Sequence, residues 1–366
     1  MATNRWLATG NFFTTYKEEQ RIFLTHLDRT AMALFIALLY VWPWFLEMDN
    51  KTMLVIDTIL IAMVAILGLN LVTGFAGLIS IGHAAFVGVG AYTAALFASS
   101  LGTDHVFLTH WWPVVIVLSG LMGAVFGGLV GLPALRLKHL YLAIATLSFQ
   151  MIFEWTIQIM TLFNQGQTMP LGRVFWFTGE VGRKQHYVFW YFAILTVVVL
   201  CGFGVRNLLR TRYGRCLIAV RDNDRAADAM GMHPGFTKVY AFALAGFLAG
   251  VAGALHAYLY RGAGFESFTL HHSITYLAMA IVGGLGTLSG SFWGPAAIVL
   301  LDLQMETLSE WLKSSDILPA GMNLATGLRP LAFGLVIVLF LMFEPRGIAN
   351  WWRITRSYLK LWPFRY

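Results

Sequence analysis

Apolar segments about 20 residues long recur along this 366-residue chain, and they constrain its fold more than any other feature. Hydrophobic residues make up 58% of the sequence and charged residues only 12%, which is far from the composition of a soluble domain. A helix that crosses a bilayer needs about 17 to 25 apolar residues, whereas the strands of an outer-membrane barrel alternate apolar and polar residues, a pattern that this sequence lacks. The sequence therefore predicts an all-α, polytopic membrane helical bundle.

The apolar pattern predicts about ten transmembrane or re-entrant helices. They cover residues 30–46, 53–72, 82–99, 112–135, 140–163, 187–206, 237–260, 272–287, 291–310 and 326–343. The chain then divides into an N-terminal segment, a transmembrane domain and a C-terminal tail, which are residues 1–29, 30–343 and 344–366. Two glycine-rich segments, 68–90 and 283–294, fit broken or re-entrant helices as well as full crossings.

The distribution of Lys and Arg predicts the orientation of these helices. An even number of crossings places both termini on one side, and cytoplasmic loops carry an excess of basic residues. If both termini are cytoplasmic, 18 of the 25 basic residues fall on the cytoplasmic side. The net charge of +7 then reflects orientation and not a nucleic-acid-binding patch. The first 29 residues do not resemble a cleaved signal peptide, so we expect the first helix to stay in the membrane.

One charged segment, Arg221–Met232, stands out because five of its twelve residues are charged. It lies in the longest predicted cytoplasmic loop, 207–236. A single helix would place four charged residues on one stripe, with opposite charges three positions apart: Arg221, Asp224, Arg225 and Asp228. A second face would hold Val220, Ala227 and Met230. Such a helix is suited to docking on a partner protein, and a solvated loop helix without a partner is the alternative interpretation.

Several motifs around this segment carry a family resemblance. Arg225–Gly231 resembles the EAA-xxx-G signature of bacterial ABC importers, whose permeases insert a coupling helix into an ATPase subunit, although Arg225 stands where that signature often has Glu. The other motifs follow in order: GLNLVTGFAGLISIGHAAFVGVGAYTAAL, GLPALRLKHLYLAIATLSF, YGRCLIAVRDNDRAADAMGM, FALAGFLAGVAGAL, AIVGGLGTLSGSFWGPA and FEPRGI. Over about residues 53–348, the chain is similar to the LivM-like permeases of the branched-chain (hydrophobic) amino acid ABC transporter family.

The resemblance implies a non-enzymatic permease subunit of an ABC importer in the bacterial inner membrane. Such a subunit forms half of an alternating-access pathway for branched-chain amino acids or a related small solute, such as urea, a short amide or an aromatic acid. The implied partners are a second homologous permease, two cytoplasmic ABC ATPase subunits and an external solute-binding protein. The expected ATPase-coupling residues are Arg221, Asp222, Asp224, Arg225, Ala226, Ala227, Asp228 and Gly231.

The chain itself is expected to hold neither a cofactor nor a metal. It has no G-x-x-x-x-G-K-[ST] loop, so we expect ATP and Mg to bind the ATPase subunits. No H-E-x-x-H motif supports an intramembrane enzyme, and no catalytic residue is assigned. Cys201 and Cys216 have no spacing that indicates a disulfide or a metal site.

Glycines spaced four residues apart predict close packing of membrane helices. These glycines are Gly123, Gly127 and Gly131, then Gly246 and Gly250, then Gly286, Gly290 and Gly294. Broken helices at membrane depth can also expose backbone groups to a solute. The candidate residues for the translocation pathway are Gly74, Gly77, His83, Gly88, Glu154, Gly283, Gly284 and Gly286. For His83, a hydrogen bond within the bundle is the alternative interpretation.

Carboxylates within predicted spans are functional candidates, because charged groups are costly in a membrane. Asp57 and Glu306 are expected near the outer interface. Glu154 departs from the family pattern Phe-x-Glu-Ile, since this chain reads Phe-Gln-Met-Ile at 149–152, and this departure leaves the exact solute open. A stand-alone secondary transporter or channel is the alternative function, and its ion-coupling site would use Asp57, Glu154 and Asp302.

Overall fold

The computed structural model describes residues 26–45, 49–100, 111–137, 140–160, 166–171, 183–314, 334–335, 338–340, 342–344 and 347–361. These residues are mainly helical, as the sequence predicts. The helices are α2 (His26–Phe45), α3 (Asn50–Asn70), η1 (Leu71–Phe75), α4 (His83–Ser100), α6 (Trp112–Gly131), η2 (Pro133–Leu135), α7 (Leu140–Ile159), α8 (Arg183–Leu208), α9 (Arg212–Asp222), α10 (Asp224–Ala229), α11 (Pro234–Tyr260), η5 (Phe265–Phe268), α12 (Leu270–Gly283), α13 (Gly290–Ser314) and α15 (Ile348–Leu361). Two short strands, β1 (Met169–Pro170) and β2 (Gly262–Ala263), pair antiparallel.

Several helices are long and apolar enough to cross a bilayer. Within the described part of the chain they are Asn50–Phe75, Trp112–Gly131, Leu140–Ile159, His186–Leu208 and Pro234–Tyr260. Arg29–Pro43 and His83–Phe97 are shorter apolar helices. The predicted span 326–343 falls largely outside the described residues. The full number of crossings therefore stays a prediction.

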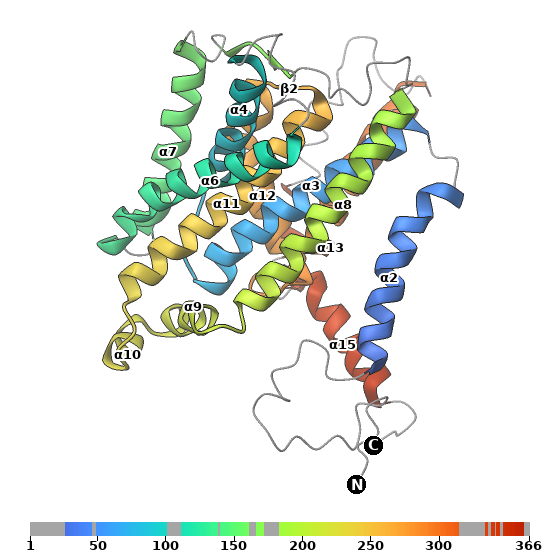
Figure 1. Ribbon diagram of the computed structural model, residues 1–366. Helices are drawn as coiled ribbons and strands as arrows, with labels where there is room; N and C mark the ends of the chain where they lie inside the picture. Colours follow the sequence, from blue (N-terminus) through green and yellow to red (C-terminus); the bar gives the residue numbers. More distant parts are fainter. Residues whose placement is uncertain are drawn as a thin grey trace.

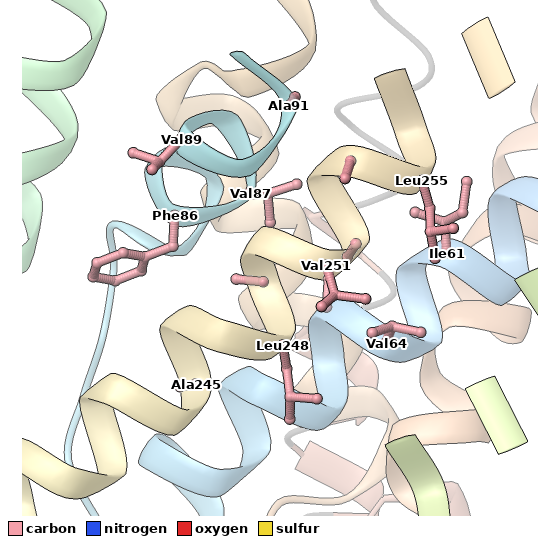
Figure 2. Packing of buried hydrophobic residues seen from close by; sticks show 14 of the residues in the cluster. Ile61, Val64, Phe86, Val87, Val89, Ala91, Ala245, Leu248, Val251 and Leu255 are labelled. Atoms are coloured by element: carbon pink, nitrogen blue, oxygen red, sulfur yellow. The ribbon is translucent and has the colours of Figure 1, made fainter. Parts of the chain in front are cut away.

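Two helices, α3 and α11, form the centre of the bundle. Of the most apolar stretch of each, 67% is buried, compared with 28% for α7 at the edge. Figure 2 shows α11 running between α4 and α3, with Val251 and Leu255 directed toward α3 and Val87 of α4 directed toward α11. Burial on all sides matches their nearly continuous apolar sequence, because only a helix without a polar face can be enclosed in this way.

Close packing of α6 against α11 confirms the prediction from the glycine spacing. A Cβ atom at Gly127 would overlap the carbonyl oxygen of Phe242, and one at Gly250 would overlap that of Ser119. The missing side chains let the two backbones touch, which is how membrane helices gain packing energy without a hydrophobic driving force.

The α9–α10 segment lies at one end of the bundle (Figure 1). The start of α2 and the end of α15 point toward the same end. The placement of both termini on the cytoplasmic side stays a prediction. At the start of α3, Lys51 Nζ lies 3.7 Å from Glu306 Oε1 of α13. This pair places Glu306 beside the start of α3, and its position near the outer interface stays a prediction.

Candidate functional site

The charged segment forms two helices and not one, so the prediction of a single helix is wrong. Asn223 has an extended backbone, with φ −159° and ψ 106°, which ends α9 and starts α10. Its side-chain Oδ1 accepts hydrogen bonds from the backbone N–H groups of Arg225 (3.0 Å) and Ala226 (3.2 Å). Asparagine is among the best N-cap residues because its side chain satisfies these free donors, and this local bonding outweighs continuation of the helix.

The break also removes the predicted charged stripe. Asp224 pairs with Lys238 of α11, with Nζ and Oδ2 2.6 Å apart, and not with Arg221. Arg221 Nε instead donates to its neighbour Asp222 at 3.0 Å. The structure describes both Arg225 and Asp228, and these two residues form no ion pair with each other. The Lys238 side chain is only 9% exposed, so this ion pair fastens α10 to the start of α11 in a largely desolvated position.

The face of α10 that is turned outward differs from the predicted one. Ala227 is 3% exposed and Val220 is also buried, so both pack against their own chain. Met230 is 79% exposed and Phe236, in the first turn of α11, is 75% exposed. Arg225, Ala226, Asp228 and Gly231 are exposed as well. We call Arg225, Ala226, Asp228, Met230 and Phe236 the α10 surface.

The first glycine-rich segment is a broken helix. After α3, the π-helical turn η1 is followed by non-helical residues 76–82, and α4 starts at His83. His83 Nε2 donates to the carbonyl oxygen of Ala65 at 2.8 Å. Ala65 precedes the end of η1 by ten residues, which corresponds to about 15 Å of helix. The chain thus returns along α3, and α4 begins near the middle of the apolar layer.

The second glycine-rich segment is broken too. Residues 284–289 separate α12 from α13. Gly284 has φ 112° and Gly286 has φ 73°, conformations that only glycine adopts readily. At the end of α12, Gly283 packs so closely on Gly290 that neither has room for a side chain.

Asn70 joins the two breaks. Its Nδ2 donates to Thr287 O (2.7 Å) and Ser291 Oγ (2.8 Å), and its Oδ1 accepts from Gly286 N (2.8 Å). A Cβ atom at Gly74 would overlap both Asn70 Oδ1 and the backbone nitrogen of Gly286. We call Asn70, Gly74, Gly77, Gly284 and Gly286 the glycine junction. The sequence motifs indicate its glycines but not Asn70, whose only signal is a carboxamide at the end of an apolar run.

A second polar cluster holds the start of α4. The backbone N–H groups of Ala84 and Ala85 donate to Ser273 Oγ and Gln150 Oε1, both at 2.8 Å. Gln150 Nε2 in turn donates to Phe268 O at 2.7 Å. The side chains of Gln150 and Ser273 thus satisfy donors that a helix start at this depth leaves without intrahelical partners. No sequence motif indicates either residue as part of the site.

Glu154 caps a second helix start beside this cluster. Its Oε1 accepts from the backbone N–H of Leu270, the first residue of α12, at 2.6 Å and from Gln150 Nε2 at 2.9 Å. A carboxylate is favourable at a helix N-terminus because of the helix dipole. His83 and Glu154 therefore both have partners within the chain, and Gly88 faces the ring of Phe153. For His83, the interpretation as a hydrogen-bonded residue of the bundle is confirmed.

Within the described part of the chain, the other candidate carboxylates do not gather into a site. Asp57 is fully buried in the protein, and neither of its oxygens has a hydrogen-bond partner. Its position near the outer interface stays a prediction. Asp302 lies on α13 and is exposed. Among the residues that the structure describes, no three His, Cys, Asp or Glu side chains come together as a metal site would require. The alternative function would use Asp57, Glu154 and Asp302 as an ion-coupling site, and these three carboxylates therefore do not form a common site in this structure.

Comparison with known proteins places this arrangement in a family. A family model described as the permease component of branched-chain amino acid transport systems matches residues 51–343, which include the glycine junction and α10. The chain belongs to this family. It is a multi-pass membrane protein of the ABC transporter permeases for branched-chain amino acids, as its sequence motifs predict.

Individual relatives support the same assignment over most of the chain. The chain is 29% identical to the high-affinity branched-chain amino acid transport system permease protein LivM of Escherichia coli (strain K12) and 30% identical to that of Salmonella typhimurium, in each case over 94% of this chain and 77% of the relative. It is 24% identical to the probable branched-chain amino acid transport permease protein LivM of Methanocaldococcus jannaschii, over 77% of this chain and 88% of the relative. No solved structure matches the chain.

Proposed function

We propose that this chain is the permease subunit of an ABC importer and forms half of the membrane pathway for branched-chain amino acids or a related small hydrophobic solute. The observation that carries the proposal is the α10 surface, an exposed apolar and charged surface at one end of a bundle that contains two broken helices. Its partners would be a second homologous permease, two cytoplasmic ATPase subunits and an external solute-binding protein. The complex would lie in the bacterial inner membrane with both permease termini cytoplasmic.

The exposed side chains of the α10 surface support an ATPase contact. Met230 and Phe236 lie on a segment with Arg and Asp side chains, within one of the most basic loops of the chain. Basic loops lie on the cytoplasmic side, where lipid tails do not cover exposed apolar side chains. Exposed apolar groups rimmed by polar residues are typical of protein interfaces. An ATPase groove with an acidic group opposite Arg225 would fit this surface.

The broken helices support a pathway beside α4. The α4 start lies near mid-depth, and its polar groups are tied to α7 and α12 by Gln150 and Ser273. The structure is closed around them, since His83 is only 1% exposed. Transport would then require relative movement of the helices that meet there, as in alternating access. The solute-binding protein would set most of the solute selectivity.

Co-purification and uptake measurements test this proposal. The tagged chain should carry ABC ATPase subunits through purification, and replacement of residues 221–231 by a neutral linker of equal length should release them. A matched control replaces an equally long stretch of α15, 351–361, whose residues 351–355, 357 and 358 are exposed, and this change should leave the ATPases bound. Liposomes with the whole complex should take up solute only with ATP and the solute-binding protein.

The alternative function predicts the opposite results. Uptake by this chain alone, driven by an ion gradient, would identify a stand-alone secondary transporter and reject the proposal. Retention of the ATPases by the 221–231 linker variant would reject α10 as their contact.

A further inference from the structure

Arg221 differs from the other charged residues of its segment because its side chain also contacts the interior of the bundle. It stands in the last turn of α9, and its Nη1 donates to the carbonyl oxygen of Gly74 at 3.1 Å. Gly74 is 147 positions earlier in the sequence and belongs to η1, at the end of the first broken helix. One side chain therefore connects the α9–α10 segment to the glycine junction.

The same side chain contacts both breaks. Its Cγ would lie 2.6 Å from a Cβ atom at Gly77, which has φ 68°, and its Nη1 would lie 3.3 Å from a Cβ atom at Gly286. Gly77 and Gly286 thus leave room for the stem and the head of Arg221. Asn70, the last residue of α3, accepts a hydrogen bond from Gly286 N, which connects the two breaks. The guanidinium of Arg221 therefore contacts two breaks that are already joined to each other.

The guanidinium is also fixed from the other side. Asp222 Oδ1 accepts from Arg221 Nε at 3.0 Å, while Nη1 points to Gly74. The planar fork of arginine can hold two such acceptors in one geometry, which the point charge of lysine cannot do. The orientation of α9 and the position of the Gly74 carbonyl are thereby coupled through a rigid group.

We propose that Arg221 is a positioning residue that transmits movement of α9 and α10 to the glycine junction. The proposal rests on the proposed function, in which an ATPase moves α10. When α9 shifts, Arg221 carries the η1 carbonyl and the backbone of residues 284–289 with it, and this changes the angle between the two halves of each broken helix. Arg221 is thus a contact inside the permease, while the outward contact belongs to Arg225, Met230 and Phe236.

A purely structural role makes a different prediction. Arginine at a helix C-terminus can satisfy a free carbonyl and interact favourably with the helix dipole. Loss of such a cap lowers stability, but it does not change how much ATP is consumed per solute moved. The ratio of ATP hydrolysed to solute taken up therefore separates the two roles.

The first experiment measures this ratio for the complete complex in liposomes. In Arg221→Met, we expect the ATP hydrolysed per solute to rise by about tenfold, since a hydrogen bond to a charged group is lost. Arg221→Lys keeps the charge but not the fork and should give an intermediate ratio. Arg212→Met, which removes an exposed arginine from the first turn of the same helix, is the control and should match wild type.

The outcomes separate failure of this inference from failure of the proposed function. A wild-type ratio in Arg221→Met, within a complex that imports solute with ATP, overturns the inference alone. If the wild-type chain binds no ATPase or transports without ATP, the proposed function fails first. A lower melting temperature of Arg221→Met with an unchanged ratio assigns Arg221 to the structural role and also overturns the inference.

A second experiment keeps Arg221, so its outcome does not depend on whether an Arg221 variant folds. Spin labels at Arg215→Cys on α9 and Leu285→Cys in the second break report the distance between the two units, in a background with Cys201 and Cys216 replaced by Ser. In wild type, this distance should stay the same with and without ATP while α9 moves relative to α6. A nucleotide-dependent change in the distance from α9 to Leu285 contradicts the inference.

Discussion

Gly123 of α6 and Gly246 of α11 face each other so closely that a Cβ atom on either would overlap the carbonyl oxygen of the other. The overlap is with backbone and not with the end of a flexible side chain, so the helices themselves would have to separate. Gly204 in α8 is the opposite case, because a Cβ atom there would meet no heavy atom within 4 Å.

This pair predicts a large difference between two identical substitutions. Gly246→Ala should lower the free energy of unfolding by about 1–3 kcal/mol, as overpacking does in closely packed interiors. Gly204→Ala should leave it unchanged or raise it slightly, because alanine favours helix more than glycine. Thermal unfolding of the purified variants in detergent measures both values. Equal stability of the two variants would contradict the close packing of α6 on α11.

Asn70→Leu should weaken the connection between the two broken helices. The substitution removes one acceptor and two donor contacts, and each buried polar group left without a partner costs about 1–3 kcal/mol. We expect a lower melting temperature and a loss of ATP-driven uptake. Asn207→Leu, at an exposed position in α8, is the matched control and should retain both. Full uptake by Asn70→Leu would show that transport does not need this connection.

Gln150→Leu should loosen the start of α4. Its carboxamide accepts from Ala85 N and donates to Phe268 O, so its loss leaves a buried N–H and a buried carbonyl without these partners. Hydrogen exchange of the peptide at 83–88 should become about tenfold faster or more, which corresponds to the cost of one unsatisfied buried group. Gln158→Leu, exposed on the same helix, serves as the control. Unchanged exchange at 83–88 would contradict the capping role of Gln150.

Lys238→Met should release α10 from α11. The ion pair with Asp224 has side chains that are 9% and 28% exposed, and loss of a charged hydrogen bond of this kind costs about 1.5–3 kcal/mol. Hydrogen exchange in 224–230 should rise, and binding of the ATPase subunits should weaken. The double variant Lys238→Met with Asp224→Asn should be closer to wild type than Lys238→Met alone, because it leaves no unpaired carboxylate. If the single variant binds the ATPases as wild type does, the ion pair does not position α10.

The helical architecture and the two breaks follow from the sequence for physical reasons. Apolar runs of about 20 residues require helices in lipid, and glycines spaced four apart require close helix contacts. The contacts within the site could not be derived in the same way. Asn70 meets Gly286 across 216 positions, and Gln150 meets Ser273 across 123 positions, so no local pattern encodes these pairs.

The wrong prediction of a single helix over Arg221–Met232 has a local cause. Helical spacing of charges favoured one continuous helix, but Asn223 is a strong N-cap whose side chain bonds the next amides. Its cap turns α10 by an amount that spacing alone does not reveal. This turn moves Ala227 inward and leaves Ala226 outward, so Ala226 and not Ala227 lies on the exposed face of α10.

Ala226→Glu and Ala227→Glu therefore have different expected effects. Ala227 is buried, so a carboxylate there must be desolvated or must displace α10, and we expect unfolding of α10 together with loss of the ATPases. Ala226 is exposed, so Ala226→Glu should leave the free energy of unfolding within about 0.5 kcal/mol of wild type, as surface substitutions usually do, while it weakens ATPase binding by charge and bulk. Co-purification and hydrogen exchange of 224–230 distinguish the two effects. If Ala226→Glu binds the ATPases as wild type does while Ala229→Glu does not, the contact lies on the Ala229 side of α10 and the α10 surface must be redrawn around that residue.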